Sequence, residues 1–380
     1  MVFLFWVSLF AIFYAYLGYP LVLLLFSIFK RKRTKFSKTS ITPTVSLLIS
    51  AYNEEKVIEE KLKNSLSLDY PKALLEILVI SDGSDDKTDE IVKRYADQGI
   101  ILRSYQGRIG KTACLNKAIQ LTKGDIIVFS DANSYYDRNA IRELVQDFAD
   151  EGIGFVTGTT EYISEDIDIS HYSVGLYTKM EQITKKLENK MGSCVGADGA
   201  IFAVRKHLYQ PLHPFDINDL VIPLNIIRQG YRGIFNEKAF CKEKLSRDDK
   251  EDFNRQARIT NRTIRAIFNN INLLNPFEFG LFSYELFSHK LSKFSVPFFM
   301  VTLLITNLFL IPKGPLFVLF LAGQLFFYLL AWLGFLRKNF ASLSKLAFLC
   351  KTFLFINLAI SIGWIKYFKR ETFTTWTVAR

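Results

Sequence analysis

The chain has 380 residues, of which 49% are hydrophobic and 22% charged, an unusual combination for a soluble protein. The apolar residues, which include most of the 35 phenylalanines, concentrate towards the two ends. We therefore attribute the net charge of +11 to basic flanks that meet anionic lipid, and not to nucleic-acid binding. The four cysteines are far apart and form no CxxC pair, which argues against a disulfide framework or a zinc site.

The first predicted element is the uncharged segment Phe3–Phe29, which is long enough to cross about 30 Å of hydrocarbon. A basic run, residues 30–33 (KRKR), follows at once, and the positive-inside rule places it in the cytoplasm. No positive region precedes the apolar run, so we interpret it as an anchor and not as a cleaved signal peptide. We expect residues 1–30 to form a transmembrane helix with its N-terminus outside.

Residues 42–250 have the composition of a soluble domain and begin with three short apolar runs, each of which ends in a polar cluster and passes into a helical pattern. The runs are Val45–Ser50, Glu76–Asp82 and Asp125–Asp131. Such alternation predicts a parallel α/β sheet, and ligands of these sheets bind beyond the carboxyl ends of the strands. Asn53, Asp82 and Asp131 stand at those ends and suit a diphosphate and its metal.

Residues 251–290 are expected to form amphipathic interfacial helices. Four arginines fall on one face of the stretch Asn254–Asn272, with apolar residues beside them. The arginines are Arg255, Arg258, Arg262 and Arg265. Two compatible interpretations stay open: the helix lies on the inner membrane surface with its arginines on lipid phosphates, or one or two arginines point into the active site.

The C-terminal third contains two long uncharged segments, Phe294–Pro312 and Pro315–Leu336, joined by a tight Lys313-Gly314 turn. Basic residues at both ends of the pair predict a transmembrane hairpin over 291–337 that starts and finishes in the cytoplasm. The last apolar run, Thr352–Ile365, is short for a span. We expect 343–380 to form an interfacial or re-entrant helix and a cytoplasmic tail.

Five motifs in order resemble those of family 2 glycosyltransferases. The first four are Ala51-Tyr52-Asn53-Glu54-Glu55, Ser81-Asp82-Gly83-Ser84-Asp85-Asp86, Gly110-Lys111 with Leu115-Asn116-Lys117-Ala118, and Asp131-Ala132-Asn133; Asn218-Asp219 follows further on. The resemblance covers residues 42–272 and is closest to the membrane-embedded hyaluronan, cellulose, chitin and poly-N-acetylglucosamine synthases. It implies a GT-A-type (Rossmann-like) α/β domain between transmembrane and interfacial helices.

The resemblance also implies roles on the donor side. Ala51, Glu54 and Asp82 would hold the base and ribose of a nucleotide sugar, with Lys111 near the donor and Arg258 facing the diphosphate. From the residues alone, Glu54 could equally be a first-turn carboxylate favoured by the helix dipole, and Asp82 a plain turn residue.

The resemblance assigns the metal ligands and the general base in the same way. Asp131 matches the direct ligand of Mg²⁺ or Mn²⁺, and Asn133 would add an amide oxygen; the alternative is a strand-end turn. Asp219 matches the general base, so Asp219 and Asp131 are the expected catalytic pair. The alternative is that Asn218 or Asp219 caps the helix Leu220–Gln229.

Acceptor-side roles fall on Asp198 and Gly199, within the loop Cys194–Gly199, where glycine lets the backbone approach a sugar. Arg255-Gln256-Ala257-Arg258-Ile259 stands where processive members carry Q-x-x-R-W, and only Arg258 matches. Trp376 and Arg380 resemble the tryptophan and arginine of a gating segment that closes over the nucleotide; the alternative is an aromatic interface anchor and a basic tail.

The resemblance implies an inverting glycosyltransferase of the inner membrane that builds a cell-surface or extracellular polysaccharide from a nucleotide sugar, with UDP-N-acetylglucosamine or UDP-glucose first. Three transmembrane spans are too few for a full polysaccharide channel, so a secretion partner or a second copy of the chain would have to complete it. The alternative is transfer of one sugar to a lipid-linked acceptor, which the departures at Arg255 and Ile259 favour. An NAD-type oxidoreductase would need GxGxxG where Ala51-Tyr52-Asn53-Glu54 stands, and a scaffold would not need both Asp131 and Asp219.

Overall fold

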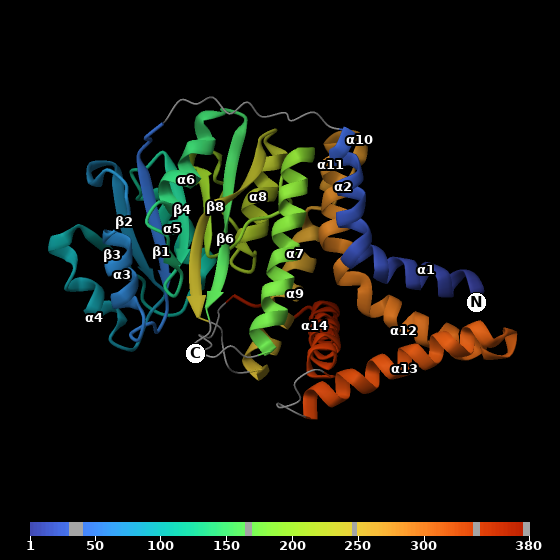
Figure 1. Cartoon of the computed structure of the whole chain (residues 1–380). Coiled ribbons are helices and arrows are strands. Elements are labelled where there is room, and N and C mark those ends of the chain that lie inside the picture. The colour runs from blue at the N-terminus through green and yellow to red at the C-terminus, as the bar shows by residue number, and fades with distance from the viewer. Residues whose placement is uncertain (30–40, 164–168, 245–248, 337–342, 375–380) are drawn as a thin grey trace.

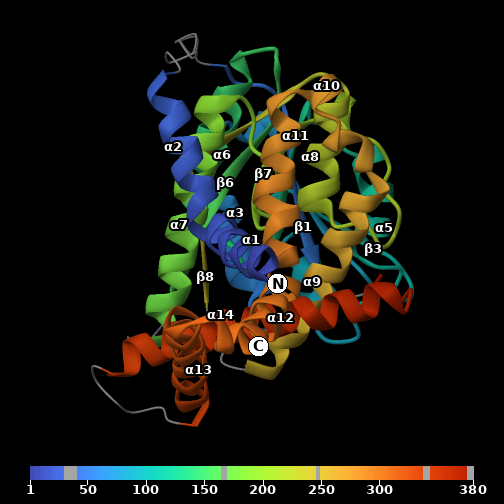
Figure 2. The ribbon, with the colours of Figure 1, turned by 90° about the vertical axis from the view of Figure 1, so that its right-hand side faces the viewer.

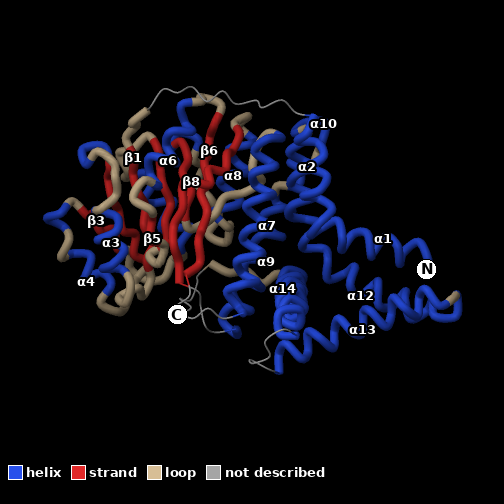
Figure 3. Tube along the Cα trace, in the orientation of Figure 1, coloured by secondary structure: helices blue, strands red, loops and turns tan. Residues whose placement is uncertain are grey.

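The computed structural model describes residues 1–29, 41–163, 169–244, 249–336 and 343–374. A single sheet of eight strands in the order β3-β2-β1-β4-β7-β6-β8-β5 forms its centre. Figure 3 shows the strands gathered on one side of the molecule and the long helices on the other. The strands are β1 (Val45–Ala51), β2 (Leu75–Ser81), β3 (Ile100–Ser104), β4 (Ile126–Asp131), β5 (Tyr135–Tyr136), β6 (Ile153–Ile163), β7 (Ile201–Arg205) and β8 (Arg232–Lys244).

The first half of the sheet is parallel, as predicted. β1 pairs with β2 and β4, and β2 pairs with β3. The register places Ser50 opposite Asp131 and Ala51 opposite Ser81, so three strand ends form one edge. The second half is mixed, because β7 runs antiparallel to both β4 and β6. The α/β fold class is therefore confirmed, with an antiparallel strand at its centre.

Each face of the sheet carries a helical layer. Every residue of β1 is buried, as expected of a strand covered on both sides. One face packs against α3 (Ile58–Leu66), α4 (Thr88–Lys93) and α6 (Ala140–Gln146). The other packs against α5 (Lys111–Gln120), α8 (Asn218–Arg228) and α9 (Asp249–Asn269). The apolar runs of the sequence thus lie in two cores on either side of the strands.

The N-terminal segment is helical throughout but bent. α1 (Val2–Phe13) packs along α12 (Ser292–Leu310), whereas α2 (Tyr19–Phe29) packs on α7 (Ile169–Met191) of the sheet domain. A π-helical turn over Tyr14–Gly18 separates the two helices, and Pro20 lacks the N–H that would continue the ladder there. Figure 1 shows the bend between α1 and α2, and the expected transmembrane helix stays a prediction that fits the candidate span Val2–Phe29.

The C-terminal helices include a hairpin and a crossing helix. α10 (Pro276–Phe279) and α11 (Leu281–Leu286) lead through a π-helical turn, Phe287–Leu291, into α12 (Ser292–Leu310), which forms the predicted hairpin with α13 (Pro315–Leu336). The hairpin turn and the N-terminus lie together, far from the sheet (Figure 1). α14 (Leu343–Phe368) is longer than the expected Thr352–Ile365 and runs across α13, as Figures 1 and 2 show together.

Four helices in the described residues are long and apolar enough to cross a membrane by length and composition: Val2–Phe29, Leu281–Lys313, Pro315–Leu336 and Lys345–Phe368. The last of these includes the run expected to be too short, because the helix extends through Lys351. An interfacial position for α14 stays a prediction, and its crossing direction agrees with it. The predicted cytoplasmic orientation also stays a prediction.

Candidate active site

The edge formed by the ends of β1, β2 and β4 gathers the predicted donor residues. Ala51 is buried, and its carbonyl accepts the N–H of Asp82. Glu54 is buried too, and its N–H donates to the Thr88 hydroxyl at 2.7 Å. It precedes α3, which begins at Ile58, but its carbonyl accepts the Ile58 N–H at 2.9 Å, so the first-turn alternative stays beside the donor role.

Asp82 holds the loop that leads into α5. Its buried carboxylate accepts the N–H groups of Ile109 at 2.8 Å and Gly110 at 3.0 Å, and contacts the Cys114 thiol at 3.3 Å. Gly110 has a φ of 93°, and a Cβ there would overlap the carbonyl of Thr374. Asp82 thus shapes this loop, and contact of its carboxylate with base and ribose stays a prediction.

The C-terminal tail reaches the same loop, since Thr374 contacts Gly110 just before Lys111. The Arg265 guanidinium on α9 donates to the Glu371 carbonyl at 3.0 Å and so ties the tail down. Trp376 and Arg380, the expected gating residues, lie outside the described residues. Their role therefore stays a prediction, with the tail entering beside the donor loop.

Lys111 and Asp131 form an ion pair across the predicted phosphate position. Both side chains are about one-third exposed, at 26% and 37%, and lie at the start of α5 and the end of β4. Asn133 is half-buried two residues further on. A lysine and a carboxylate at one point suit a diphosphate with its cation.

The residues present fit a metal that is shared with substrate. No group of three or more His, Cys, Asp and Glu side chains in the described part of the chain could hold a metal alone. Mg²⁺ typically takes one or two carboxylates together with substrate phosphates, and Mn²⁺ also accepts oxygen ligands. Asp131 and the Asn133 amide offer oxygen ligands of that kind.

Three buried residues, Lys61, Ser134 and Glu243, pack around the turn that follows Asp131, and the sequence analysis did not single them out. Lys61 is fully buried on α3, donates to the Ser134 carbonyl and lies 4.2 Å from the centre of the Tyr136 ring. Burial lowers the pKa of Lys61 to about 8. The Ser134 hydroxyl donates to Glu243 of β8, whose pKa burial raises to about 7 with the help of Asp131. Lys61 shares one helix face with Ile58, Leu62 and Ser65, and this spacing was the signal in the sequence that could have indicated its burial.

Asp219 lies in the first turn of α8 without serving as its cap. The N-cap of this helix is Ile217 and no side chain caps it, so the capping alternative is wrong. Asn218 instead accepts from the Thr112 hydroxyl at 2.7 Å. Oδ1 of Asp219 is buried and has no hydrogen-bond partner among the described residues. Such an atom is an acceptor left available for a bound ligand.

The charges around Asp219 set its protonation. Burial raises the pKa of this carboxyl, while the cations Lys290, Lys111 and Arg262 act to lower it. Arg262 comes from α9 and is held by the Phe215 carbonyl at 3.0 Å and the Thr112 hydroxyl at 3.2 Å. Of the four aligned arginines, Arg262 is thus the one whose charge acts on the predicted base. Burial and Arg255 lower the pKa of Arg258, whose contact with the diphosphate stays a prediction.

The loop Cys194–Gly199 lies directly against Asp219. The Ala197 N–H donates to the Asp219 carbonyl at 2.8 Å, and a Cβ on Gly199 would lie 3.2 Å from Oδ2. Asp198 faces the sheet: its carboxylate accepts the N–H of Thr160 at 2.9 Å and of Ala200 at 3.1 Å. Gly199 therefore shapes the site around the base, while an acceptor contact for Asp198 stays a prediction.

Comparison with known proteins identifies the domain. Residues 46–210 match the model of the family described as "Glycosyl transferase family 2". Within these residues the chain is similar to the family, which agrees with the resemblance found in the sequence motifs.

Two curated relatives and one solved structure illustrate the range. A beta-monoglucosyldiacylglycerol synthase of Nostoc sp. (strain PCC 7120) is 37% identical over 118 residues, 30% of this chain and 25% of the relative. A poly-beta-1,6-N-acetyl-D-glucosamine synthase of Staphylococcus aureus is 25% identical over 203 residues, 52% of this chain and 49% of the relative. The chain thus spans half or less of the length of these relatives.

The solved structure is a mannosyltransferase from Pyrobaculum calidifontis, in complex with GDP-mannose and Mn²⁺. It is 20% identical, has a TM-score of 0.74, and matches 97% of this chain and 99% of its own. The likeness extends through the long apolar helices and confirms the GT-A-type fold with its flanking helices.

Proposed function

We propose that the protein is an inverting membrane glycosyltransferase that builds a polysaccharide from a nucleotide-sugar donor. The observation that carries this proposal is the buried Oδ1 of Asp219, which no described residue hydrogen-bonds, beside the loop of Gly199 and among three cations. A carboxylate in this setting is suited to take a proton from an acceptor hydroxyl.

The reaction follows from these positions. Asp219 takes the proton of the acceptor hydroxyl while that oxygen attacks the anomeric carbon of the donor sugar. The bond from this carbon to the diphosphate breaks, and the nucleoside diphosphate leaves with the electron pair, so the anomeric configuration inverts. Lys111 lies where the departing phosphate oxygens would need a counter-charge. Mg²⁺ or Mn²⁺, held by Asp131 and Asn133, would supply further charge compensation on the diphosphate.

The donor and acceptor are inferred by analogy. We infer a UDP-sugar, as the sequence motifs imply, with the catalytic domain on the cytoplasmic face of the plasma membrane. A second candidate is transfer of a single sugar to a lipid-linked acceptor. Arg255 and Ile259 depart from the motif of processive members, and one relative by name makes a glycolipid while another makes a polymer.

The test uses detergent-purified protein with a panel of nucleotide sugars and either Mg²⁺ or Mn²⁺. Nucleotide release with one donor, abolished by a chelator and by Asp219→Asn or Asp131→Ala, supports the proposal. Asp147→Asn is the matched control, because Asp147 is also a buried carboxylate but bonds Asn236 at 3.0 Å, beneath β8. Gel sizing of the product separates polymer from single addition. Turnover that survives Asp219→Asn overturns the proposal.

A further inference from the structure

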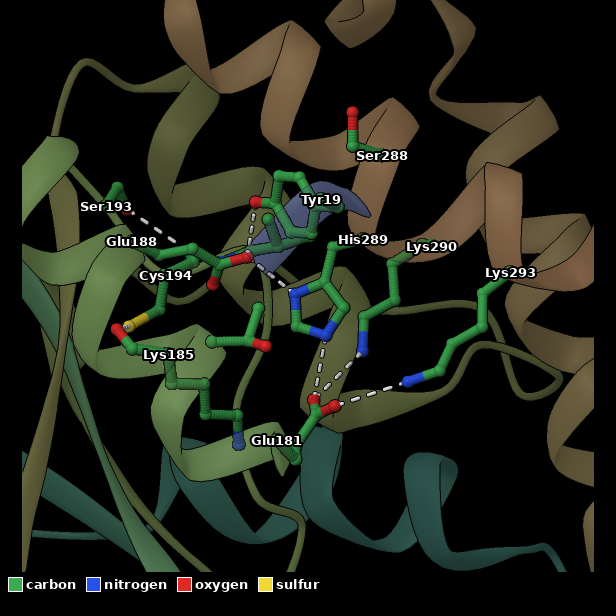
Figure 4. A network of polar contacts seen from close by, with 12 residues as sticks. Tyr19, Glu181, Lys185, Glu188, Ser193, Cys194, Ser288, His289, Lys290 and Lys293 are labelled. Carbon is green, nitrogen blue, oxygen red and sulfur yellow. Dashed lines mark hydrogen bonds and ion pairs between the residues drawn. The ribbon is translucent and has the colours of Figure 1, made fainter. Parts of the chain in front are cut away.

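A buried polar cluster joins the membrane helices to the sheet domain (Figure 4). The Tyr19 hydroxyl of α2 donates to Glu188 Oε1 on α7 at 2.8 Å. His289, in the π-helical turn before α12, lies with Nδ1 2.6 Å from the same Glu188 oxygen and Nε2 2.9 Å from Glu181 Oε1. The His289 and Glu188 side chains are 3% and 0% exposed. Three elements far apart in sequence therefore meet at one carboxylate.

The charges in this cluster are complementary. Although burial acts to raise it, the pKa of Glu181 is held well below its usual range by His289, Lys293 and Lys290. Each nitrogen of the His289 ring lies within hydrogen-bond distance of a carboxylate oxygen, so the ring bridges Glu188 and Glu181. Hydrogen bonds between charged groups in a buried setting are short and directional. His289 thus fixes the turn Phe287–Leu291 relative to α7.

The second oxygen of Glu188 continues the connection towards the site. Oε2 accepts the N–H of Val195 at 3.4 Å, and Val195 opens the stretch that ends at Gly199 beside Asp219. The same turn that carries His289 also carries Lys290. A Cβ on Gly196 would lie 3.9 Å from Lys290 Cε, and the Lys290 charge acts on Asp219. The cluster and the predicted base are therefore linked on two sides of one loop.

We propose that Glu188 and His289 are positioning residues, which hold the loop Cys194–Gly199 and Lys290 against Asp219 and lock this side of the site to the membrane helices. The inference rests on the proposed function for its catalytic meaning, because the loop lies where an acceptor would meet Asp219. Loss of either residue loosens the acceptor side while the donor residues on β1, β2 and β4 keep their places.

Glu188→Gln and His289→Gln test the inference. Gln at 188 keeps the shape but offers one acceptor oxygen and an N–H₂ group that opposes either Val195 or His289. The matched control is Tyr14→Phe, because Tyr14 bonds Tyr284 at 2.8 Å and Ser288 at 2.7 Å within the same junction, away from the loop. Tyr19→Phe is the mildest variant, since it removes only one hydroxyl from Glu188.

The first measurement is amide hydrogen exchange of full-length protein in detergent, which needs no turnover. We expect exchange across 194–199 to rise by about 10-fold in both Gln variants and to stay at the wild-type rate in Tyr14→Phe. If a Gln variant does not fold, Tyr19→Phe should show the same pattern with a smaller rise. Unchanged exchange in the variants that fold, or an equal rise in Tyr14→Phe, overturns the inference.

The second measurement separates transfer from donor hydrolysis. Misplacement of the acceptor side should lower transfer by about 10-fold and raise KM for the acceptor, while hydrolysis of the donor and nucleotide binding stay within about two-fold. A purely structural role would lower Tm and leave the ratio of transfer to hydrolysis unchanged. Wild-type protein without turnover would contradict the proposed function alone, because the exchange experiment still decides the positioning role.

Discussion

Gly199 lies so close to Asp219 that a Cβ at position 199 would stand 3.2 Å from Oδ2 of the carboxylate. Gly199→Ala should therefore push the carboxylate by a few tenths of an ångström and lower kcat for transfer by about 10-fold. Stability should change little, because Gly199 does not adopt a positive φ. Transfer assays and thermal unfolding of the variant check this. A fully active Gly199→Ala variant would remove Asp219 from the role of base.

The pH dependence of transfer should report the Asp219 carboxyl. Burial raises its pKa, and the base works only when ionised, so activity should fall as pH falls, with a midpoint above that of an ordinary aspartate. Lys290→Gln removes a cation that lowers this pKa, so the acidic limb should move to higher pH. The check is a profile of kcat against pH for wild type and variant. A limb that moves to lower pH contradicts the assignment.

The protonation state of Asp219 also affects the stability of the fold, and the direction of this effect follows from the raised pKa of its carboxyl. A carboxyl whose pKa is raised on folding stabilises the fold below its unfolded pKa, and that contribution is lost as pH rises through the folded value. At neutral pH the ionised, buried carboxylate is therefore a cost. Asp219→Asn should abolish transfer yet unfold at a temperature equal to or above that of wild type, which thermal unfolding measures directly.

Lys61→Met tests the contact that supports the turn after β4, which carries the expected metal ligands Asp131 and Asn133. Methionine fills similar space without the donor, so the Ser134 carbonyl loses its buried partner at a cost of about 1–3 kcal/mol. Loosening of Asp131 and Asn133 should weaken Mn²⁺ binding by about 10-fold, measured by calorimetry with nucleotide present. The control is Lys63→Met, since Lys63 is exposed beside Glu59 on the same helix. Equal Mn²⁺ affinity in both variants would contradict a positioning role for Lys61.

Gly233 packs directly against the Phe155 ring on the neighbouring strand. A Cβ there would overlap the Phe155 ring, which lies in the core, so Gly233→Ala should destabilise the fold by roughly 3 kcal/mol. Gly192→Ala is the matched control, because a Cβ at 192 would meet open space. Denaturant unfolding in detergent compares the two variants, and similar stabilities would show that the strand pair relaxes around the added methyl group.

Much of the sheet could be predicted because its strands are read from short apolar runs. Val45–Ser50 is a short run with apolar residues at four of its six positions and is buried on both sides, as in a covered parallel strand, and the polar residues that follow mark the edge where ligands are expected to bind. The expectation of a ligand site at that edge rests on Asp82 and Asp131 at the strand ends, whereas Asp219 is assigned by its resemblance to a family motif. What the pattern does not contain is the direction of each carboxylate. Asp82 accepts the Ile109 N–H of the loop before α5, and Asp198 accepts the Thr160 N–H of β6.

The bend of the N-terminal helix and the role of Lys61 could not be predicted for different reasons. Uniform hydrophobicity over Phe3–Phe29 gives length but no direction, so the π-helical turn at Tyr14–Gly18 leaves no signal in composition. Lys61 stands in a charged stretch that resembles a solvated helix face, and only the chain segment at Ser134 makes its burial favourable. A long-range partner decides the burial of Lys61, whereas the bend lies at the local break before Pro20.

The contacts of the N-terminal segment with later parts of the chain also imply an order of events during biosynthesis. Tyr14 emerges from the ribosome long before Tyr284 and Ser288, its hydrogen-bond partners, and Tyr19 long before Glu188. The N-terminal helix must therefore wait in the bilayer with polar side chains that its own segment does not satisfy, while the sheet domain is still being translated. The Tyr19 contact can form once α7 is made, whereas the Tyr14 contacts wait for Tyr284 and Ser288, so a chain truncated between these elements would have the first junction and lack the second.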